Sequence, residues 1–247
     1  MTIQTSHKID LPETLHTKCY ERLTSLFLKI AKDYFHSFGL GTVIGGIMSP
    51  VHDDYKKKDL VAAHHRVAML KLALRSSSWV KVSEWETRQA GWTRTRMSLQ
   101  HHQRGGSGGG GECSRSPCPV GLRIVKLLCG ADLLESFATP GLWSDDDVER
   151  IVGGHGLVVV SRAGCDPARF VYDNDLLYRN ITLITNYIAN EVSSTVVRRA
   201  VRRGESAKYL TDDAVIDYIH THGLYADKGP TLFTQVMSIQ YRFQSES

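Results

Sequence analysis

The sequence has 247 residues, 42% of them hydrophobic and 23% charged, a composition that suits one globular domain with a buried core and excludes disorder of the whole chain. The formal net charge of +4 is mild, so it permits anionic ligands such as nucleotides without requiring a nucleic acid partner. Five cysteines without paired CxxC spacing argue against a disulfide framework and against a zinc site, and they favour a reducing compartment.

Hydrophobicity gives no indication of a membrane segment. No apolar run approaches the roughly 20 residues that a membrane-spanning helix needs, and the N-terminus lacks the basic-then-apolar order of a signal peptide. We therefore expect no membrane partner and a location in the cytoplasm or the nucleus.

Helix and strand patterns alternate in the first hundred residues. In chain order, the sequence predicts a helix over 23–37, a short buried strand within 41–50, an amphipathic helix over 59–74 and an alternating strand over 79–86. A run rich in Gly and Ser, residues 104–119, then predicts a flexible loop.

The pattern resumes after this loop. The apolar run 124–132 predicts a buried strand that ends at Gly130, where a helix would begin, and 156–164 and 180–185 predict two further buried strands. A basic helix is predicted within 190–210. A last helix over 212–225 would be capped by Thr211 and would stop at Gly223.

Buried β-branched strands separated by helices indicate an α/β fold, a doubly wound parallel sheet covered by helices on both faces. In such sheets, ligands bind beyond the carboxyl ends of the strands. Gly130, Asp132 and the segment before the basic helix would all lie there.

The start of the basic helix allows two interpretations. Ser193, Ser194 and Thr195 are good N-cap residues, since a side-chain oxygen can accept a hydrogen bond from an unpaired N–H group of the first turn. The same N–H groups also favour an anion, and Arg198 and Arg199 would add positive charge one turn further on. The stretch therefore predicts a structural cap or a phosphate site.

Two histidine pairs, His64-His65 and His101-His102, could suggest a metal site. Adjacent residues on a helix point in different directions, and no carboxylate completes a ligand set. We therefore assign no metal ligand to the protein.

A basic helix can also indicate nucleic acid binding. The arginines concerned are Arg198, Arg199, Arg202 and Arg203. Only one helix is basic, however, and no nucleic acid-binding motif accompanies it, so we expect no nucleic acid partner.

Several blocks, in order from about Ile30 to Tyr225, resemble those of the eukaryotic nicotinamide/nicotinic acid mononucleotide adenylyltransferases. They are "GIMSPVHDDYKKKDLVAAHHRVAML", "EWETRQAGW", "LLCGADLLESFATPGLW", "GLVVVSRAGCDP" and "NEVSSTVVRRAVRRGESAKYLTDDAVIDYIHTHGLY". The resemblance implies a Rossmann-like nucleotidyltransferase domain. It also implies an enzyme of NAD biosynthesis that joins a mononucleotide to the AMP part of ATP and releases pyrophosphate.

The resemblance also implies site residues. For ATP, with Mg²⁺ bound to its phosphates, these are Gly130, Asp132, Ser193, Ser194, Thr195 and Arg198. For the mononucleotide and the dinucleotide, they are Lys57, Trp92, Thr95, Leu142, Trp143 and Asn190. From the residues alone, the lysine run around Lys57 could equally be a solvated loop and Trp92 a core aromatic.

The resemblance fails at the N-terminus. Family members begin with an apolar strand, a Gly-Ser-Phe-x-Pro phosphate loop and a histidine, and no such loop occurs in this sequence. Gap-free alignment places Thr24 at the histidine position, and His16 lies too far upstream. No catalytic residue is therefore assigned. Because residues 1–20 contain no apolar run, we expect the first strand to be missing or replaced, with a loss of backbone partners.

The sequence divides into three parts on this basis. Residues 1–29 form an atypical N-terminal segment, 30–226 the nucleotidyltransferase-like domain and 227–247 a tail without family match. We expect a homo-oligomer. Without the phosphate loop, the alternative to a full enzyme is a catalytically impaired family member that acts as a nucleotide-binding or chaperone-like interaction protein.

Overall fold

The computed structural model describes most of the chain. It covers residues 2–5, 21–55, 60–105, 124–161, 166–174, 180–186 and 192–226. The tail 227–247, the predicted site residues Lys57 and Asn190, His16 and most of the Gly-rich loop lie outside the described residues.

The described residues contain a six-stranded parallel sheet with the order β3-β2-β1-β4-β5-β6. The strands are β1 (Thr2–Thr5), β2 (Gly45–Met48), β3 (Val80–Val82), β4 (Val125–Gly130), β5 (Leu157–Ser161) and β6 (Ile181–Thr185). The strand order reverses between β1 and β4, which makes this the topological switch point at which doubly wound sheets bind ligands. The predicted fold class is confirmed.

Strand β1 corrects one expectation. We expected the first strand to be missing or replaced, with a loss of backbone partners, and Thr2–Thr5 pairs in parallel with β2 on one side and with β4 on the other. The first strand is thus replaced rather than missing, and the expected loss of backbone partners is wrong. A four-residue strand held on both sides by backbone hydrogen bonds needs no long apolar run, which is why the hydrophobic pattern failed to predict it.

The core lies on both faces of β4 and β5. Leu127 and Val159 pack into the cluster on one face, with Leu99 and Leu134. The next residues along each strand point the other way, and Leu128 joins the second cluster. Because both faces are apolar, the sheet needs a helical layer on each side.

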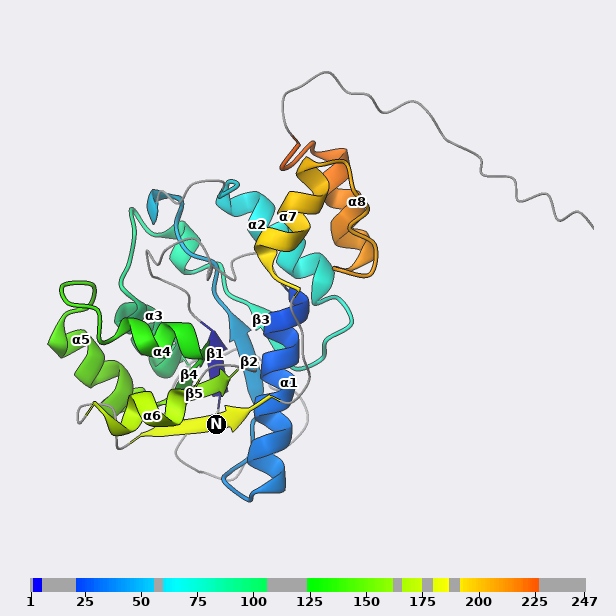
Figure 1. The fold of residues 1–247 in the computed structure, drawn as a ribbon. Helices are drawn as coiled ribbons and strands as arrows, with labels where there is room; N and C mark the ends of the chain where they lie inside the picture. Colours follow the sequence, from blue (N-terminus) through cyan, green and yellow to red (C-terminus); the bar gives the residue numbers. More distant parts are fainter. Residues whose placement is uncertain are drawn as a thin grey trace, which may run out of the picture.

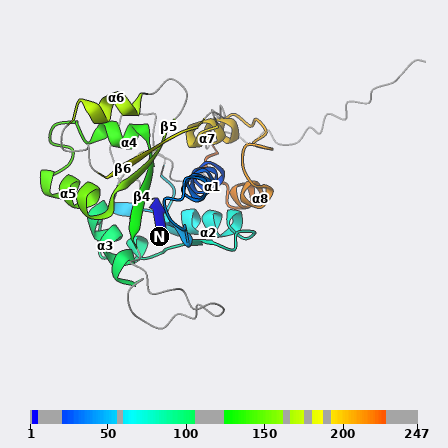
Figure 2. The ribbon, with the colours of Figure 1, turned by 90° about the horizontal axis from the view of Figure 1, so that it is seen from below.

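The helices form these two layers, as Figures 1 and 2 show from two directions. One layer contains α1 (Glu21–Ser37), α2 (Ala63–Ala73), α7 (Ser194–Arg202) and α8 (Asp213–Thr221). The other contains α3 (Thr95–Gly105), α4 (Ala131–Ser136), α5 (Asp145–Glu149) and α6 (Pro167–Tyr172), with a π-helical turn over Arg150–His155.

The predicted helices of the first layer are confirmed, with one correction at a cap. Asp212, not Thr211, is the N-cap of α8, and its carboxylate accepts a hydrogen bond from the N–H of Ala214 at 3.0 Å. Thr211 is buried instead. The helices of the second layer, except the start of α4, were not predicted, and α3 reaches Gly105, so the first two residues of the predicted loop are helical.

The central position of β1 generates the first prediction. Gln4→Pro removes a backbone donor from the middle of the ladder and should lower the free energy of unfolding by about 2–4 kcal/mol. Gln4→Thr keeps the donor and is the control. Urea denaturation measures both variants, and equal stability of the two would mean that residues 2–5 do not pair in the sheet.

A partly buried histidine on α3, His102, generates the second prediction. Burial lowers the pKa of His102 from 6.5 to about 4, with a smaller contribution from His101, and among the described residues its Nε2 atom has no hydrogen-bond partner. The unfolded chain therefore binds this proton at a higher pH than the folded chain. Stability should be full above about pH 6.5 and should decrease as the pH falls toward about 4, by on the order of 1–2 kcal/mol for a partly exposed group.

Denaturation curves between pH 7 and pH 4 test this proton linkage. His102→Leu should flatten the pH dependence of the unfolding free energy, whereas His36→Gln, which changes an exposed histidine at the end of α1, should leave it as in the parent. An unchanged slope in His102→Leu would assign the acid sensitivity to other groups.

Candidate functional site

The carboxyl end of β4 carries the first pair of predicted ATP residues. Gly130 ends β4 and is the N-cap of α4. A Cβ atom at this position would lie 2.3 Å from Oδ1 of Asp132, so a glycine is needed for the carboxylate to approach the backbone so closely. Burial, reinforced by the negative charge of Asp132, raises the pKa of the neighbouring Cys129, which keeps that thiol protonated.

The N-terminus of α7 carries the second group. The Ser193 hydroxyl accepts a hydrogen bond from the N–H of Val196 at 3.4 Å, which confirms the capping interpretation. Ser194 is buried and Thr195 is exposed at the helix start, while Arg198 is half-buried one turn further on. A cap satisfies only part of the first turn, so the phosphate interpretation stays a prediction beside it.

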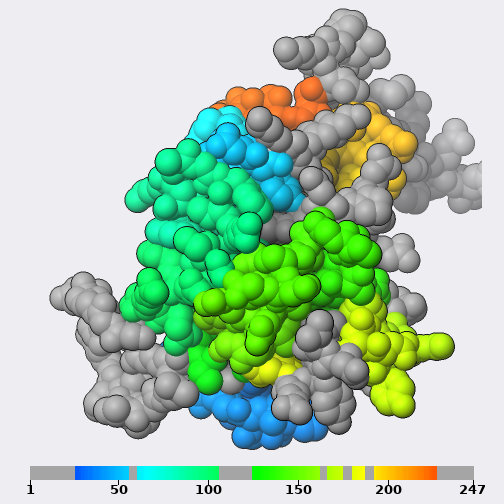
Figure 3. All heavy atoms as spheres, turned by 90° about the vertical axis from the view of Figure 1, so that its left-hand side faces the viewer, coloured from blue at the N-terminus to red at the C-terminus, as the bar shows by residue number. Residues whose placement is uncertain are grey.

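Four predicted mononucleotide residues line one pocket of about 320 Å³. They are Trp92, Thr95, Leu142 and Trp143, and the remaining lining residues are Arg94, Gly141, Ser144 and Asp147. The pocket thus joins two segments about fifty positions apart, and Figure 3 shows the face on which residues near 80–105 lie beside residues near 130–155. Its volume lies at the lower end of the range for small-molecule sites.

The two tryptophans of the pocket have different surroundings. The Trp143 indole donates a hydrogen bond to Oγ of Ser136 at 3.2 Å, and its ring meets Phe137 edge-on at 4.9 Å. These contacts fix the ring against the core. Trp92 remains 46% exposed, which excludes the alternative of a core aromatic.

Thr95 supplies a polar group in the pocket wall. It is the first residue of α3, its side chain is buried, and within the described part of the chain its hydroxyl has no hydrogen-bond partner. A buried hydroxyl without a partner is unfavourable by about 1–3 kcal/mol, so a ligand or water that bonds to it would remove this cost.

Buried charged residues position the segments that lead to the site. Arg66 is fully buried, and its guanidinium donates to the backbone carbonyls of Val51 and Val61 at 2.8 and 2.9 Å and to the carboxylate of Asp53 at 2.6 Å. These contacts hold the chain on both sides of the segment 56–59. The placement of Lys57, within that segment, is not described.

A second buried contact holds the chain before Trp92. Ser49, directly after β2, donates a hydrogen bond to the buried carboxylate of Glu86 at 2.9 Å. Trp85 stacks on His101 of α3, with ring centroids 4.3 Å apart. Both contacts hold the segment between β3 and α3 at residues 85–86.

Sequence reasoning missed four of the lining residues, and two of these four are charged. Arg94 stands between Trp92 and Thr95, and Asp147 lies in the first turn of α5; their side chains are joined at 3.1 Å. The position of Arg94 between two predicted site residues was a signal that could have identified it. Asp147 had no such signal, because only the folded chain brings α5 to α3.

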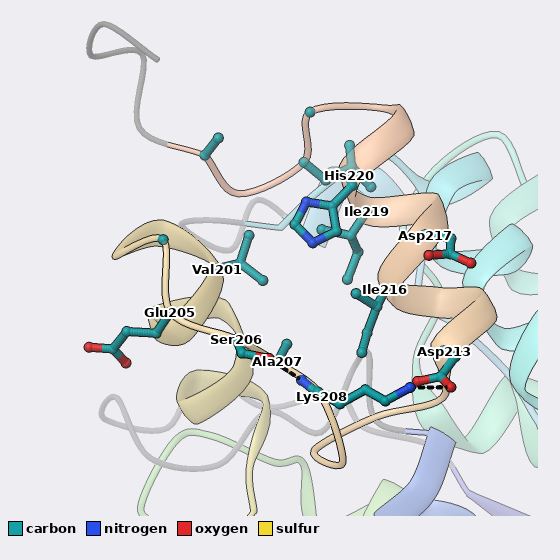
Figure 4. A pocket seen from close by; sticks show the side chains of 14 residues that line it. Val201, Glu205, Ser206, Ala207, Lys208, Asp213, Ile216, Asp217, Ile219 and His220 are labelled. Carbon is teal, nitrogen blue, oxygen red and sulfur yellow. Dashed lines mark hydrogen bonds and ion pairs between the residues drawn. The ribbon is translucent and has the colours of Figure 1, made fainter. Parts of the chain in front are cut away.

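A further pocket of about 800 Å³ lies between α7 and α8. Val201, Ile216 and Ile219 point into it, Glu205 points away, and Lys208 pairs with Asp213 at its edge (Figure 4). None of the predicted ATP or mononucleotide residues lines it, so we do not assign it to these ligands.

The histidine pairs have structural contacts. His65 is 3.0 Å from the Tyr218 hydroxyl, which joins α2 to α8, and its ring lies 5.3 Å from that of His222. The described residues contain no group of three or more His, Cys, Asp or Glu side chains that could hold a metal ion. Within the same residues, no helix combines the length and the hydropathy needed to cross a membrane.

Comparison with known proteins identifies the family. A family model described as cytidylyltransferase-like matches residues 19–200. A Drosophila melanogaster protein named nicotinamide-nucleotide adenylyltransferase is 48% identical over 234 residues, which cover 87% of this chain and 58% of the fly protein. This chain thus spans less than two thirds of that relative.

Two other relatives are covered more fully. The nicotinamide/nicotinic acid mononucleotide adenylyltransferase 1 of Bos taurus is 39% identical, with 85% of this chain and 86% of the bovine protein aligned. The nicotinamide/nicotinic acid mononucleotide adenylyltransferase of Arabidopsis thaliana is 36% identical, with 87% of this chain and 86% of the plant protein aligned. The family-model match and these identities show that the chain belongs to the nicotinamide/nicotinic acid mononucleotide adenylyltransferase family, within the cytidylyltransferase-like proteins.

Proposed function

We propose that the protein transfers the adenylyl group of ATP to nicotinamide or nicotinic acid mononucleotide, giving the dinucleotide and pyrophosphate in NAD biosynthesis. The names of its relatives support this activity. The observation that carries the proposal is the pocket that gathers Trp92, Thr95, Leu142 and Trp143, because it holds aromatic rings together with a buried hydroxyl that has no hydrogen-bond partner among the described residues.

The mononucleotide would bind in this pocket. A pyridine ring can stack on the exposed face of Trp92 and contact Leu142 and Trp143, while the Thr95 hydroxyl can donate to or accept from a polar group of the ligand. Lys57 would bring a positive charge to the phosphate, and Asn190 would add a polar contact.

ATP would bind at the carboxyl edge of the sheet. Asp132, whose carboxylate lies close to the backbone at Gly130, would accept hydrogen bonds from the ribose hydroxyls. Ser194, Thr195 and the first-turn N–H groups of α7 would bind the phosphates, with Arg198 adding positive charge. Mg²⁺ would enter as part of the MgATP substrate.

The transfer itself is a substitution at phosphorus. A phosphate oxygen of the mononucleotide attacks the α-phosphorus of ATP, the bond between the α-phosphorus and its bridging oxygen to the β-phosphate breaks, and pyrophosphate leaves with the electron pair. The chain's contribution is to align the two phosphates and to stabilise the negative charge on the leaving group. No group in the described residues is assigned as acid or base.

The sequence between β1 and α1 favours a reduced rate. In the sequence, residues 6–20 follow β1, as the phosphate loop follows the first strand in the family, and they lack Gly-Ser-Phe-x-Pro. Loss of one donor to developing charge commonly lowers a rate by about 10²–10³-fold. A nucleotide-binding or chaperone-like interaction protein is therefore the second candidate function.

The assay of purified protein with MgATP and either mononucleotide tests this proposal. We expect dinucleotide and pyrophosphate in equal amounts, at a rate at least about 10²-fold below that of a relative with the complete loop. A chimera that carries Gly-Ser-Phe-x-Pro after Thr5 should be faster. A parent that binds mononucleotide but forms no product would favour the second candidate, and a parent that binds no mononucleotide would contradict the proposed site.

Asp132 provides a separate test of the ATP site. Asp132→Ala should weaken binding of adenine nucleotides by roughly 1.5–3 kcal/mol, the range for hydrogen bonds to charged groups. Glu135→Ala, at an exposed position of the same helix, is the matched control. Calorimetry measures the affinities. Lower thermal stability with unchanged affinity would show that Asp132 only stabilises the start of α4.

The remaining properties are proposed on family resemblance. We propose a homo-oligomer in the cytoplasm or nucleus, with no nucleic acid or membrane partner. The mild net charge of +4 is consistent with a protein whose anionic ligands are nucleotides.

A further inference from the structure

One wall of the mononucleotide pocket contains Arg94, to which the proposed function assigns no role. Arg94 lines the pocket beside Trp92 and Thr95, and its side chain is 56% exposed. Among the described residues, the acidic group that it contacts is Asp147, through a single Nη1 atom at 3.1 Å. A guanidinium carries five N–H donors, so most of its hydrogen-bonding capacity remains for a ligand.

Asp147 does not fully neutralise Arg94, because the same carboxylate also contacts Arg96. The Nε atom of Arg96 lies 3.0 Å from the second oxygen of Asp147. Asp146 in turn binds Arg96 at 2.5 Å and Arg150 at 2.7 Å. Three guanidinium groups thus share two carboxylates through direct contacts, so the carboxylate of Asp147 is not reserved for Arg94.

Two other charged groups belong to the same helix as Asp146 and Asp147. Asp145 and Glu149 are exposed on α5, where water screens their charges. They are not among the residues that line the pocket, whereas Arg94 is. The positive charge of Arg94 therefore acts most directly on a ligand inside the pocket.

The start of α3 adds a second feature that favours an anion. Thr95 is the first residue of this eleven-residue helix, so the positive end of the helix dipole lies at the pocket wall. The Thr95 hydroxyl in the same wall is buried and, among the described residues, has no hydrogen-bond partner. Arg94, the helix end and this hydroxyl come together where the pyridine ring would bind.

We infer that Arg94 makes the pocket selective for the mononucleotide whose pyridine ring carries a carboxylate, nicotinic acid mononucleotide, over the one that carries a neutral carboxamide. This inference rests on the proposed function. A planar guanidinium matches a carboxylate with two parallel hydrogen bonds, whereas a carboxamide offers it one acceptor and presents an NH₂ group that repels it.

The test compares the two mononucleotides, which differ only in the ring substituent. Calorimetry gives the Kd of each for the parent, for Arg94→Gln and for Arg94→Lys. Arg94→Gln should weaken the acid by about three- to tenfold, a modest factor because the site is half exposed, and leave the amide nearly unchanged. Arg94→Lys keeps the charge but loses the planar pair of donors, so it should retain only part of the preference, and the preference should decrease with added salt.

Arg88→Gln is the matched control, since it removes the same charge from an exposed arginine that pairs with Glu84 away from the pocket. It should leave both affinities unchanged. Thermal unfolding should show that Arg94→Gln remains folded, because Arg96 still pairs with Asp147.

The possible results separate the two proposals. An equal loss for both mononucleotides in Arg94→Gln would place Arg94 at the phosphate that they share and would overturn the inference. An unchanged ratio of the two affinities would overturn it as well. If the parent bound neither mononucleotide, the result would contradict the proposed function, and the inference about Arg94 with it.

Discussion

The burial of β4 and β5 on both faces is the constraint on which the rest of the molecule depends. Successive residues such as Leu127 and Leu128 pack into different core clusters, so the strands need helices on each side and cannot lie at the surface. Parallel strands covered in this way have all their carboxyl ends at one edge of the sheet. Gly130 and Thr185, the last residues of β4 and β6, lie at that edge for this reason.

The mononucleotide pocket depends on contacts between segments distant in the sequence. Arg94 and Arg96 bind Asp147 and Asp146 about fifty positions later, and these ion pairs hold the start of α3 against α5. A surface ion pair contributes little stability by itself. Here the same contacts also fix the pocket wall and determine which charge it presents to a ligand.

The sequence allowed the fold class, most strands and the helices of one layer to be predicted, because their apolar residues recur at regular intervals. The short helices α4, α5 and α6 span too few turns for that pattern, and β1 is held by backbone pairing that side-chain hydrophobicity does not reveal. Resemblance identified Trp92, Thr95, Leu142 and Trp143, which the fold does bring together. Asp147 could not be predicted, since its role arises only from the packing of α5 against α3.

The central claim is that one pocket, formed by the chain before α3 and the chain after α4, binds the mononucleotide. A crystal structure of the protein with nicotinic acid mononucleotide tests it most directly. The account predicts the pyridine ring on the face of Trp92, with its carboxylate at Arg94 and the Thr95 hydroxyl bonded to the ligand. A ring bound elsewhere, for example in the pocket between α7 and α8, with Trp92 and Thr95 free of ligand, would contradict the account.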